Sequence, residues 1–263
     1  MSLPTFFADE PLHAPASITL GEDAAHHMRV RRLDVGARVR VLDGQGAIGE
    51  GMITQLAKRH ATVAVEQLQQ FEPPAPIHLL LPVADKDRML WLAEKATELG
   101  VASWRPVLFK RSKHVNPRGE GPVFQQKTRA RMINALEQSG GAWLPTVYPE
   151  ATVEHAISAR PEGLGVVLDA GAPPLLQVLR SDASSKTSVV GSLRSLRSVT
   201  LVIGPEGGFE PAERKAFVAA GFHVASLGAQ VLRFETAGVS GVAVSRAVLD
   251  VARAAAGDTS SEL

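Results

Sequence analysis

The sequence predicts a two-domain α/β protein, in which a small all-β domain precedes a larger domain of alternating strands and helices. Before residue 70, short runs rich in β-branched residues are separated by turn residues. After residue 76, apolar runs of strand length alternate with segments whose apolar residues recur at helical spacing. The proline-rich stretch 71–76 interrupts any regular element between them, so we place the domain boundary between residues 72 and 73.

The first domain is expected to contain three short strands, at residues 39–42, 51–54 and 61–65. The segment Asp43-Gly44-Gln45-Gly46 is typical of a hairpin turn between two of them. A small barrel is the natural closure for strands of this length, because closure leaves no unpaired edge.

The second domain is expected to build a sheet from strands that alternate with helices. The expected strands are residues 77–83, 104–109, 164–168, 199–202 and 223–226. The expected helices are residues 87–99, a helix beginning near Pro122, residues 211–220 and residues 235–256. The last helix opens with small residues, which allow close packing against either the sheet or a second subunit. The Ser-rich stretch 181–198 is expected to be a surface insertion.

Composition narrows the class of protein. The chain has 263 residues, of which 45% are hydrophobic and 21% charged, and a net charge of +1. It contains no cysteine, which excludes disulfides and thiolate metal sites. The adjacent His26 and His27 are expected to be surface groups rather than metal ligands. No apolar stretch reaches the ~18 residues of a membrane helix, and no signal peptide is visible, so we expect a cytoplasmic protein without metal.

Two glycine-bearing junctions follow apolar runs near the C-terminus. The first is Ile-Gly-Pro-Glu-Gly-Gly-Phe at residues 203–209, and the second is Leu-Gly-Ala-Gln-Val-Leu-Arg-Phe-Glu-Thr-Ala at residues 227–237. Loops after the strands of an α/β protein build ligand sites, and glycine lets backbone amides approach a ligand closely. We therefore expect one pocket lined mostly by main chain. The alternative is that the glycines only turn the chain between strand and helix.

The junctions do not match a phosphate-binding motif, since neither G-x-G-x-x-G nor a P-loop is present. Glu206 would repel an anionic ligand, so a cationic or zwitterionic ligand with an adenine ring fits better. Phosphate contact is instead predicted from three basic clusters in the N-terminal half, for which a solvated surface is the alternative. The clusters lie at residues 29–40, 110–118 and 127–131.

The two junctions together resemble motifs of the ribosomal RNA small subunit methyltransferase E family, which belongs to the SPOUT class of S-adenosylmethionine (SAM)-dependent RNA methyltransferases. Further segments resemble the same family in the same order along the chain. They are residues 27–36, residues 94–101, Arg111-Ser112, residues 137–140 and Leu144-Pro145.

The resemblance implies a PUA-like RNA-binding β-barrel at residues 1–72 and a SPOUT methyltransferase domain with a C-terminal trefoil knot at residues 73–263. It implies a homodimer that uses SAM to methylate N3 of a uridine in 16S rRNA of the small ribosomal subunit. The residues it assigns to the cofactor are Leu168, Asp169, Ile203, Gly204, Pro205, Glu206, Gly207, Gly208, Leu227, Gly228, Val231, Leu232 and Thr236.

The residues expected to contact RNA are all basic. They are Arg29, Arg31, Arg32, Lys86, Arg88, Lys110, Arg111, Lys127 and Arg131. Arg233 is the expected catalytic residue, because its charge would stabilise the uracil oxygens as N3 loses its proton; the alternative is a structural salt bridge to Glu235 or Glu206. Two other classes remain open: a non-enzymatic RNA-binding protein with a vestigial pocket, and a Rossmann-type nucleotide enzyme.

Overall fold

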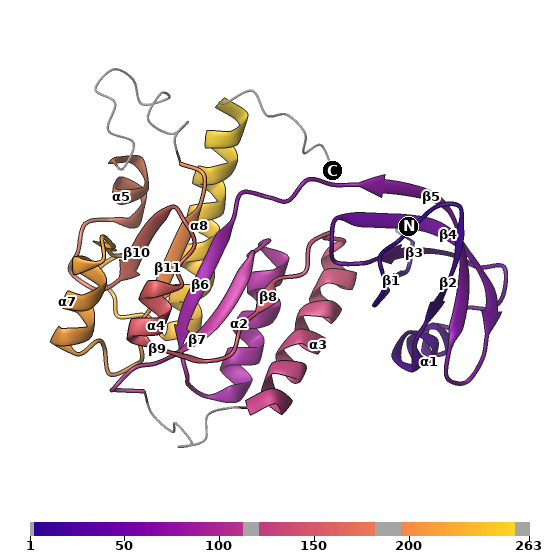
Figure 1. The fold of residues 1–263 in the computed structure, drawn as a ribbon, viewed down its shortest axis with the longest axis horizontal. Coiled ribbons are helices and arrows are strands. Elements are labelled where there is room, and N and C mark those ends of the chain that lie inside the picture. Colours follow the sequence, from indigo (N-terminus) through magenta and orange to yellow (C-terminus); the bar gives the residue numbers. More distant parts are fainter. Residues whose placement is uncertain (1–2, 113–120, 182–195, 256–263) are drawn as a thin grey trace. The chain divides into compact units, whose positions relative to one another are not determined.

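A computed structural model describes residues 3–112, 121–181 and 196–255 (Figure 1). The chain divides into two compact units. The first consists of Met1–Pro73 together with Ile133–Leu144, and the second of Pro74–Met132 and Pro145–Glu262. The break after Pro73 lies one residue beyond the predicted boundary, but nothing in the sequence pattern predicts that residues 133–144 join the first unit.

The first unit is built on a five-stranded sheet in the order β1-β3-β4-β5-β2. Its strands are β1 (Thr5–Phe7), β2 (Ala16–Leu20), β3 (Arg38–Leu42), β4 (Ala47–Leu56) and β5 (Ala61–Gln70). The β1–β3 pair is parallel and the other pairs are antiparallel. Strands β1 and β2 are the two edges of this sheet, so it is a half-barrel and the predicted barrel is confirmed only in part.

A helix, α1 (Glu22–Val30), interrupts the strands of the first unit, so the prediction of an all-β domain is wrong. Acidic Glu22 and Asp23 lie in its first turn, where they complement the helix dipole. Ala25 and Met28 are fully buried and join the core formed by one face of the sheet. The helix is short and mostly polar, which explains why hydrophobic periodicity did not predict it.

The other face of the sheet is covered at one end by residues 133–144. Leu136 and Ala142 pack there against Leu42 and Ile48. The Phe7 backbone N–H donates to the Glu137 carboxylate at 2.8 Å, and burial raises the pKa of that carboxyl. This segment therefore completes the core of the first unit.

The second unit is built on a parallel sheet in the order β12-β10-β11-β6-β7-β8, and β9 also pairs with β7. Its strands are β6 (Ile77–Pro82), β7 (Ser103–Leu108), β8 (Thr146–Val147), β9 (Ala151–Thr152), β10 (Leu164–Leu168), β11 (Val199–Ile203) and β12 (His223–Ala225). All five predicted strands of this domain are confirmed within a residue or two. The two-residue strands β8 and β9 are too short to give a pattern.

The helices of the second unit follow strands of this sheet in the chain and lie beside it (Figure 1). They are α2 (Lys86–Glu98), α3 (Gly121–Ser139, whose end belongs to the first unit), α4 (Val153–Ser158), α5 (Leu175–Ser181), α7 (Pro211–Ala219) and α8 (Phe234–Ala255). No helix in the described ranges is long and apolar enough to span a membrane. Most of the predicted Ser-rich insertion, residues 182–195, lies outside the described residues.

Two glycines near the start of α8 are packed inside the second unit. A Cβ added to Gly238 would lie 2.8 Å from a Leu92 side-chain atom, and one added to Gly241 would lie 2.9 Å from a Leu168 side-chain atom. Of the two alternatives for these glycines, the structure shows packing against α2 and the sheet.

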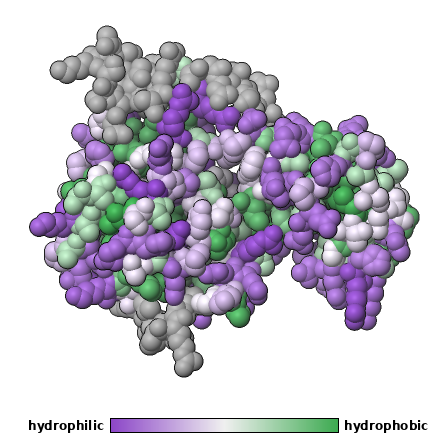
Figure 2. Space-filling model, in the orientation of Figure 1, coloured by the Kyte–Doolittle hydropathy of each residue, from purple (hydrophilic) through white to green (hydrophobic). Residues whose placement is uncertain are grey.

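Figure 2 shows hydrophilic side chains over much of the visible face, with hydrophobic ones scattered among them.

We expect His78 to make folding stability depend on pH. Burial lowers its pKa, and its Nδ1 lies 2.7 Å from Ser103 Oγ. The unfolded chain, in which the histidine pKa is about 6.5, therefore takes up the proton first as the pH falls. Stability is expected to drop as the pH is lowered through this value. Urea unfolding at several pH values should show that the free energy of unfolding depends less on pH for His78→Gln than for wild type. The control His155→Gln, which changes an exposed histidine, should keep the wild-type pH dependence. Equal pH profiles for all three proteins would contradict this role.

Candidate functional site

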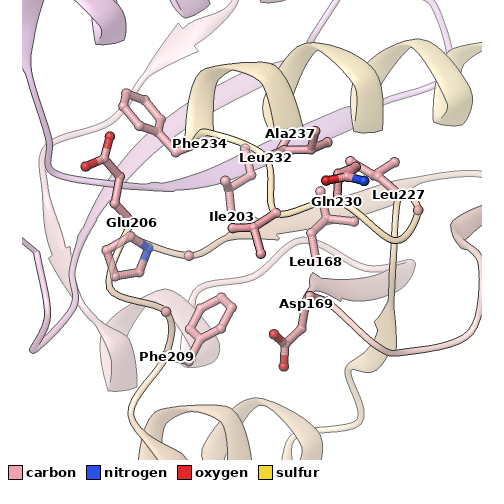
Figure 3. A pocket seen from close by; sticks show the side chains of 16 residues that line it. Leu168, Asp169, Ile203, Glu206, Phe209, Leu227, Gln230, Leu232, Phe234 and Ala237 are labelled. Atoms are coloured by element: carbon pink, nitrogen blue, oxygen red, sulfur yellow. The ribbon is translucent and has the colours of Figure 1, made fainter.

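Three loops of the second unit meet at one edge of the parallel sheet and form a pocket (Figure 3). They follow β10, β11 and β12, which lie side by side in the sheet, and the start of α8 completes the wall. The carboxyl ends of neighbouring parallel strands share one edge, which is the usual place for a ligand in such sheets. The glycine junctions therefore do more than turn the chain.

Most of the residues predicted to hold a cofactor line this pocket. They are Leu168, Asp169, Ile203, Gly204, Pro205, Glu206, Gly208, Leu227, Gly228, Val231 and Leu232. Two predicted residues, Gly207 and Thr236, are not among its lining residues. A Cβ on Gly207 would face Arg111 at 3.2 Å, and Thr236 is exposed on α8.

Five lining residues were not predicted from the sequence. They are Ala170, Phe209, Gln230, Phe234 and Ala237. Four of the five already lie within the two glycine junctions, and Ala170 directly follows the predicted Asp169. Ile203, Leu168 and Leu232 lie in the middle of the pocket, whereas the carboxylates of Glu206 and Asp169 lie at its periphery (Figure 3).

Two glycines of the pocket have backbone conformations that other residues rarely adopt. Gly208 has a φ of 72° and Gly228 a φ of 134°, and no atom lies within 4 Å of a Cβ added to either. The main chain is therefore directly exposed at these points, so that a ligand can approach its amide groups. This cradle and the apolar centre suit a flat ring system.

The pocket of the single chain is small. Its volume is about 140 Å³, below the ~300–1,000 Å³ of typical ligand pockets. Val231, at its rim, is 84% exposed. A ligand of nucleoside size would therefore remain partly uncovered in one chain.

The acidic groups around the pocket are held by arginines. Arg88 Nη1 lies 2.7 Å from Glu206 Oε1, and Arg88 Nε lies 3.8 Å from Glu235 Oε1. Arg214 Nε lies 2.9 Å from Asp169 Oδ2. These pairs neutralise the carboxylates next to the pocket and fix the loop after β11.

The same loop is also tied to the end of β7. Arg111 pairs with Glu210 and donates to the Gly207 carbonyl oxygen at 3.2 Å. The Lys110 backbone N–H donates to Glu213 at 2.7 Å, and Glu213 also closes the capping box of α7. Arg88 and Arg111, which were predicted to contact RNA, therefore support the pocket loop. Sequence reasoning missed this role because their partners lie about a hundred positions away in the chain.

Glu235 leaves one oxygen without a partner beside the pocket. Its side chain is 12% exposed, and its Oε2 is buried without a hydrogen bond. A buried acceptor of this kind normally has a donor. Glu235 is not among the residues that line the pocket, so this oxygen belongs to the packing around Arg88 rather than to the pocket surface.

Arg233 directly follows the pocket residue Leu232 and precedes α8. Its side chain is exposed, and among the described residues it makes no ion pair with Glu206 or Glu235. Arg88 takes both of those acids instead. The structure therefore does not show the predicted salt bridge of Arg233 to Glu206 or Glu235.

The other basic residues predicted to contact RNA are distributed over both units. In the first unit, Arg29, Arg31 and Arg32 are exposed at the end of α1. In the second unit, Arg131 lies 3.3 Å from Glu94 and Lys86 lies over the Phe124 ring. The Lys110 and Lys127 side chains are exposed.

The Arg29 guanidinium links α1 to the turn between β4 and β5. It donates to the Ala57 and Lys58 carbonyl oxygens at 2.6 and 2.8 Å. This contact brings Lys58 and Arg59, which sequence reasoning missed, to the same region. We call Arg29, Arg31, Arg32, Lys58 and Arg59 the α1 basic surface.

The described residues contain no group of three or more histidine and acidic side chains that could hold a metal ion. The pocket, with its main-chain cradle and neutralised acids at the end of a parallel sheet, defines an α/β protein with a site for an organic cofactor. The sequence model of the RNA methyltransferase domain family matches residues 71–246, and that of the RNA methyltransferase PUA domain matches residues 20–66. The chain therefore belongs to the RNA methyltransferase family, and the resemblance to ribosomal RNA small subunit methyltransferase E is confirmed.

Relatives that carry that name align with this chain over most of their length. The ribosomal RNA small subunit methyltransferase E of Synechocystis is 28% identical over 238 residues, which are 89% of this chain and 74% of the relative. The protein of the same name from Treponema pallidum is 27% identical over 252 residues, which are 93% of this chain and 90% of the relative.

Solved structures share the fold. A methyltransferase from Legionella pneumophila in complex with SAM has a TM-score of 0.81 at 22% identity, covering 94% of this chain and 98% of that one. Ribosomal RNA small subunit methyltransferase E from Neisseria gonorrhoeae, bound to SAM, has a TM-score of 0.79 at 24% identity with the same coverage. The fold is therefore that of an α/β methyltransferase with a PUA domain.

Proposed function

We propose that the chain methylates N3 of a uridine in 16S rRNA of the small ribosomal subunit, with SAM as the methyl donor. The observation that carries the proposal is the pocket in which the two glycine junctions meet in a chain of the RNA methyltransferase family. The relatives named for small-subunit rRNA and the solved neighbours that hold SAM support it.

The pocket residues fit SAM in shape and charge. The exposed main chain at Gly208 and Gly228 and the apolar side chains of Leu168, Ile203 and Leu232 would hold the adenine and ribose part. The carboxylates of Glu206 and Asp169 at the rim tolerate the positive charge of the ligand. When bound, SAM supplies an electrophilic methyl group on its sulfonium.

The remaining chemistry falls to the chain and the RNA. Uracil N3 carries a proton and lies on the pairing edge, so the base must be unpaired or flipped to reach the pocket. Negative charge spreads onto the uracil oxygens as the proton leaves. Arg233 would stabilise that charge, and because arginine keeps its own proton it acts as an electrostatic partner rather than as the base.

The proposal is tested by mapping methylated nucleotides in 16S rRNA from a strain that lacks this gene. We expect one uridine to lose its N3 methyl group in mass spectrometry, and the purified chain with SAM to restore it on small subunits from that strain. Unchanged methylation would overturn the proposal. Calorimetry with SAM, NAD and ATP separates it from a Rossmann-type enzyme, and absence of SAM binding would favour a non-enzymatic RNA-binding protein.

The α1 basic surface is proposed to contact rRNA phosphates. Affinity falls as salt rises, and each lost phosphate contact makes the slope of log affinity against log salt shallower by roughly 0.7–0.9. The double variant Arg31→Gln, Lys58→Gln is therefore expected to make this slope shallower by about 1.5 in filter binding to small subunits. Arg38→Gln is the matched control, because Arg38 already lies 3.9 Å from Glu50 and Glu66. Equal slopes for the double variant and wild type would exclude this surface.

The finer features implied by the resemblance are part of the same proposal. We infer a cytoplasmic homodimer in which a second copy covers the pocket, supported by the small pocket volume and the exposed Val231. We also infer a C-terminal trefoil knot, which is implied by the resemblance to the family. Light scattering that gives only the 27.9 kDa mass of one chain would contradict the dimer.

A further inference from the structure

The first unit contains a second cavity, which the methyl transfer does not use. Its volume is about 470 Å³, within the ~300–1,000 Å³ range of ligand pockets. Residues of β3, β4 and β5 form its floor, and Phe71, Ser139 and Gly140 complete its wall. Ser139 and Gly140 belong to one of the segments that resemble the family, yet they are not among the residues that line the cofactor pocket.

The floor of the cavity is the face of the sheet that lies opposite the core around Val39 and Val41. Cross-strand pairing places Arg40 beside Glu50 and Glu50 beside Gln67. The next row places Ile48 beside Gln69. The polar residues therefore stand in adjacent positions across three strands, next to the end that residues 133–144 cover.

The cavity combines polar groups that can form hydrogen bonds with apolar surface. Gln67 and Gln69 each carry an amide that both donates and accepts. Ile48 and Phe71 supply the apolar part. This combination suits a planar ring with polar edges.

Arg40 lines the cavity with a guanidinium that is held in place. Its Nη2 donates to Glu50 at 2.9 Å. The guanidinium is therefore fixed beside the glutamine amides, and its remaining N–H groups are donors.

The charges of the cavity disfavour a phosphate as the ligand. Arg40 is paired with Glu50, and neighbouring Arg38 lies 3.9 Å from Glu50 and from Glu66. Two cations thus face two carboxylates, and no net positive charge remains to attract an anion. The ligand is expected to be neutral and heteroaromatic.

We propose that this cavity binds an unpaired nucleobase of the RNA substrate, at a position other than the methylated uridine. Single-stranded bases are recognised in proteins by stacking on aromatic groups and by hydrogen bonds to their edges. The proposal rests on the RNA substrate of the proposed function. It adds a sequence-reading contact to the charge-based contacts of the α1 basic surface.

The first test uses the full chain and small probes. We expect uridine and adenosine 5′-monophosphates to shift the NMR signals of the Gln67 and Gln69 side-chain amides and of the Arg40 Nε–H. Ribose 5-phosphate, which lacks a base, is expected to leave them unchanged. Equal shifts with ribose 5-phosphate would indicate an anion site and overturn the proposal, as would no shift with any nucleotide at millimolar concentration.

The second test uses the double variant Gln67→Met, Gln69→Met, which keeps the side-chain length but removes the amides. We expect its affinity for small subunits to fall about tenfold, in line with losing one recognised base, while its SAM affinity stays at the wild-type value. The matched control is Gln55→Met, Gln138→Met, in which two exposed glutamines outside the cavity are changed.

The outcomes separate this inference from the proposed function. A wild-type chain that does not methylate small subunits contradicts the proposed function, whereas the nucleotide titration still tests the cavity. A chain that methylates normally but whose double variant binds small subunits as tightly as the control overturns the nucleobase site alone. Circular dichroism of each variant shows whether it is folded, and the titration of the wild-type chain needs no variant.

Discussion

Replacing Gly228 with valine is expected to abolish cofactor binding while the chain remains folded. Gly228 lines the pocket at a φ of 134°, where a β-branched residue is strongly disfavoured. The loop must then change its path, which costs about 1–3 kcal/mol and displaces the main chain that would hold the ligand. Titration calorimetry should show SAM affinity reduced by about a hundredfold or more, since 1.4 kcal/mol is a factor of ten and the valine side chain also takes up space that the ligand needs.

Gly36→Val is the matched control for backbone strain. Gly36 has a φ of 91° and, like Gly228, no atom within 4 Å of an added Cβ, but it belongs to the first unit. This variant should lose a similar amount of thermal stability and still bind SAM as wild type does. Gly207→Val is expected to have a smaller effect than Gly228→Val, because Gly207 is not among the lining residues. Unchanged SAM affinity in Gly228→Val would remove this loop from the site.

Replacing Arg233 with alanine is expected to slow methyl transfer by roughly 10²–10³, the usual effect of removing one group that stabilises developing charge. The side chain is exposed beside the pocket, and Arg88 rather than Arg233 holds Glu206 and Glu235. SAM affinity should therefore stay within a few-fold of wild type. Single-turnover rates on small subunits at saturating SAM measure the loss directly.

Two further variants make the Arg233 result specific. Arg180→Ala removes an exposed arginine from α5 and should leave the rate unchanged. Arg88→Ala should instead weaken SAM binding, because it removes the Arg88–Glu206 pair that fixes the pocket loop after β11. If Arg233→Ala behaves like Arg88→Ala, with collapsed SAM affinity, Arg233 is a scaffold residue and the catalytic role belongs to another group.

The elements of the second unit could largely be predicted because their signals are local. The run Leu164–Leu168 is apolar throughout and forms β10, and Pro211 begins α7 as expected from its fixed φ. The two glycine junctions located the pocket in the same way, since a loop after a buried strand is recognisable from a few residues. The short elements give no such signal and were missed; they are β1, β2, α1, β8, β9, α4 and α5.

The sequence by itself determined the order of the five longer strands and of helices α2, α3, α7 and α8 in the second unit, and the two glycine junctions that line its pocket. Only the tertiary structure decided that the first sheet stays open, that residues 133–144 complete its core, and that Arg88 and Arg111 support the pocket loop. The physical reason is the range of the interactions. Helical periodicity and turn formation act over a few residues, whereas the Arg88–Glu206 pair joins residues 118 positions apart and exists only once the sheet is packed.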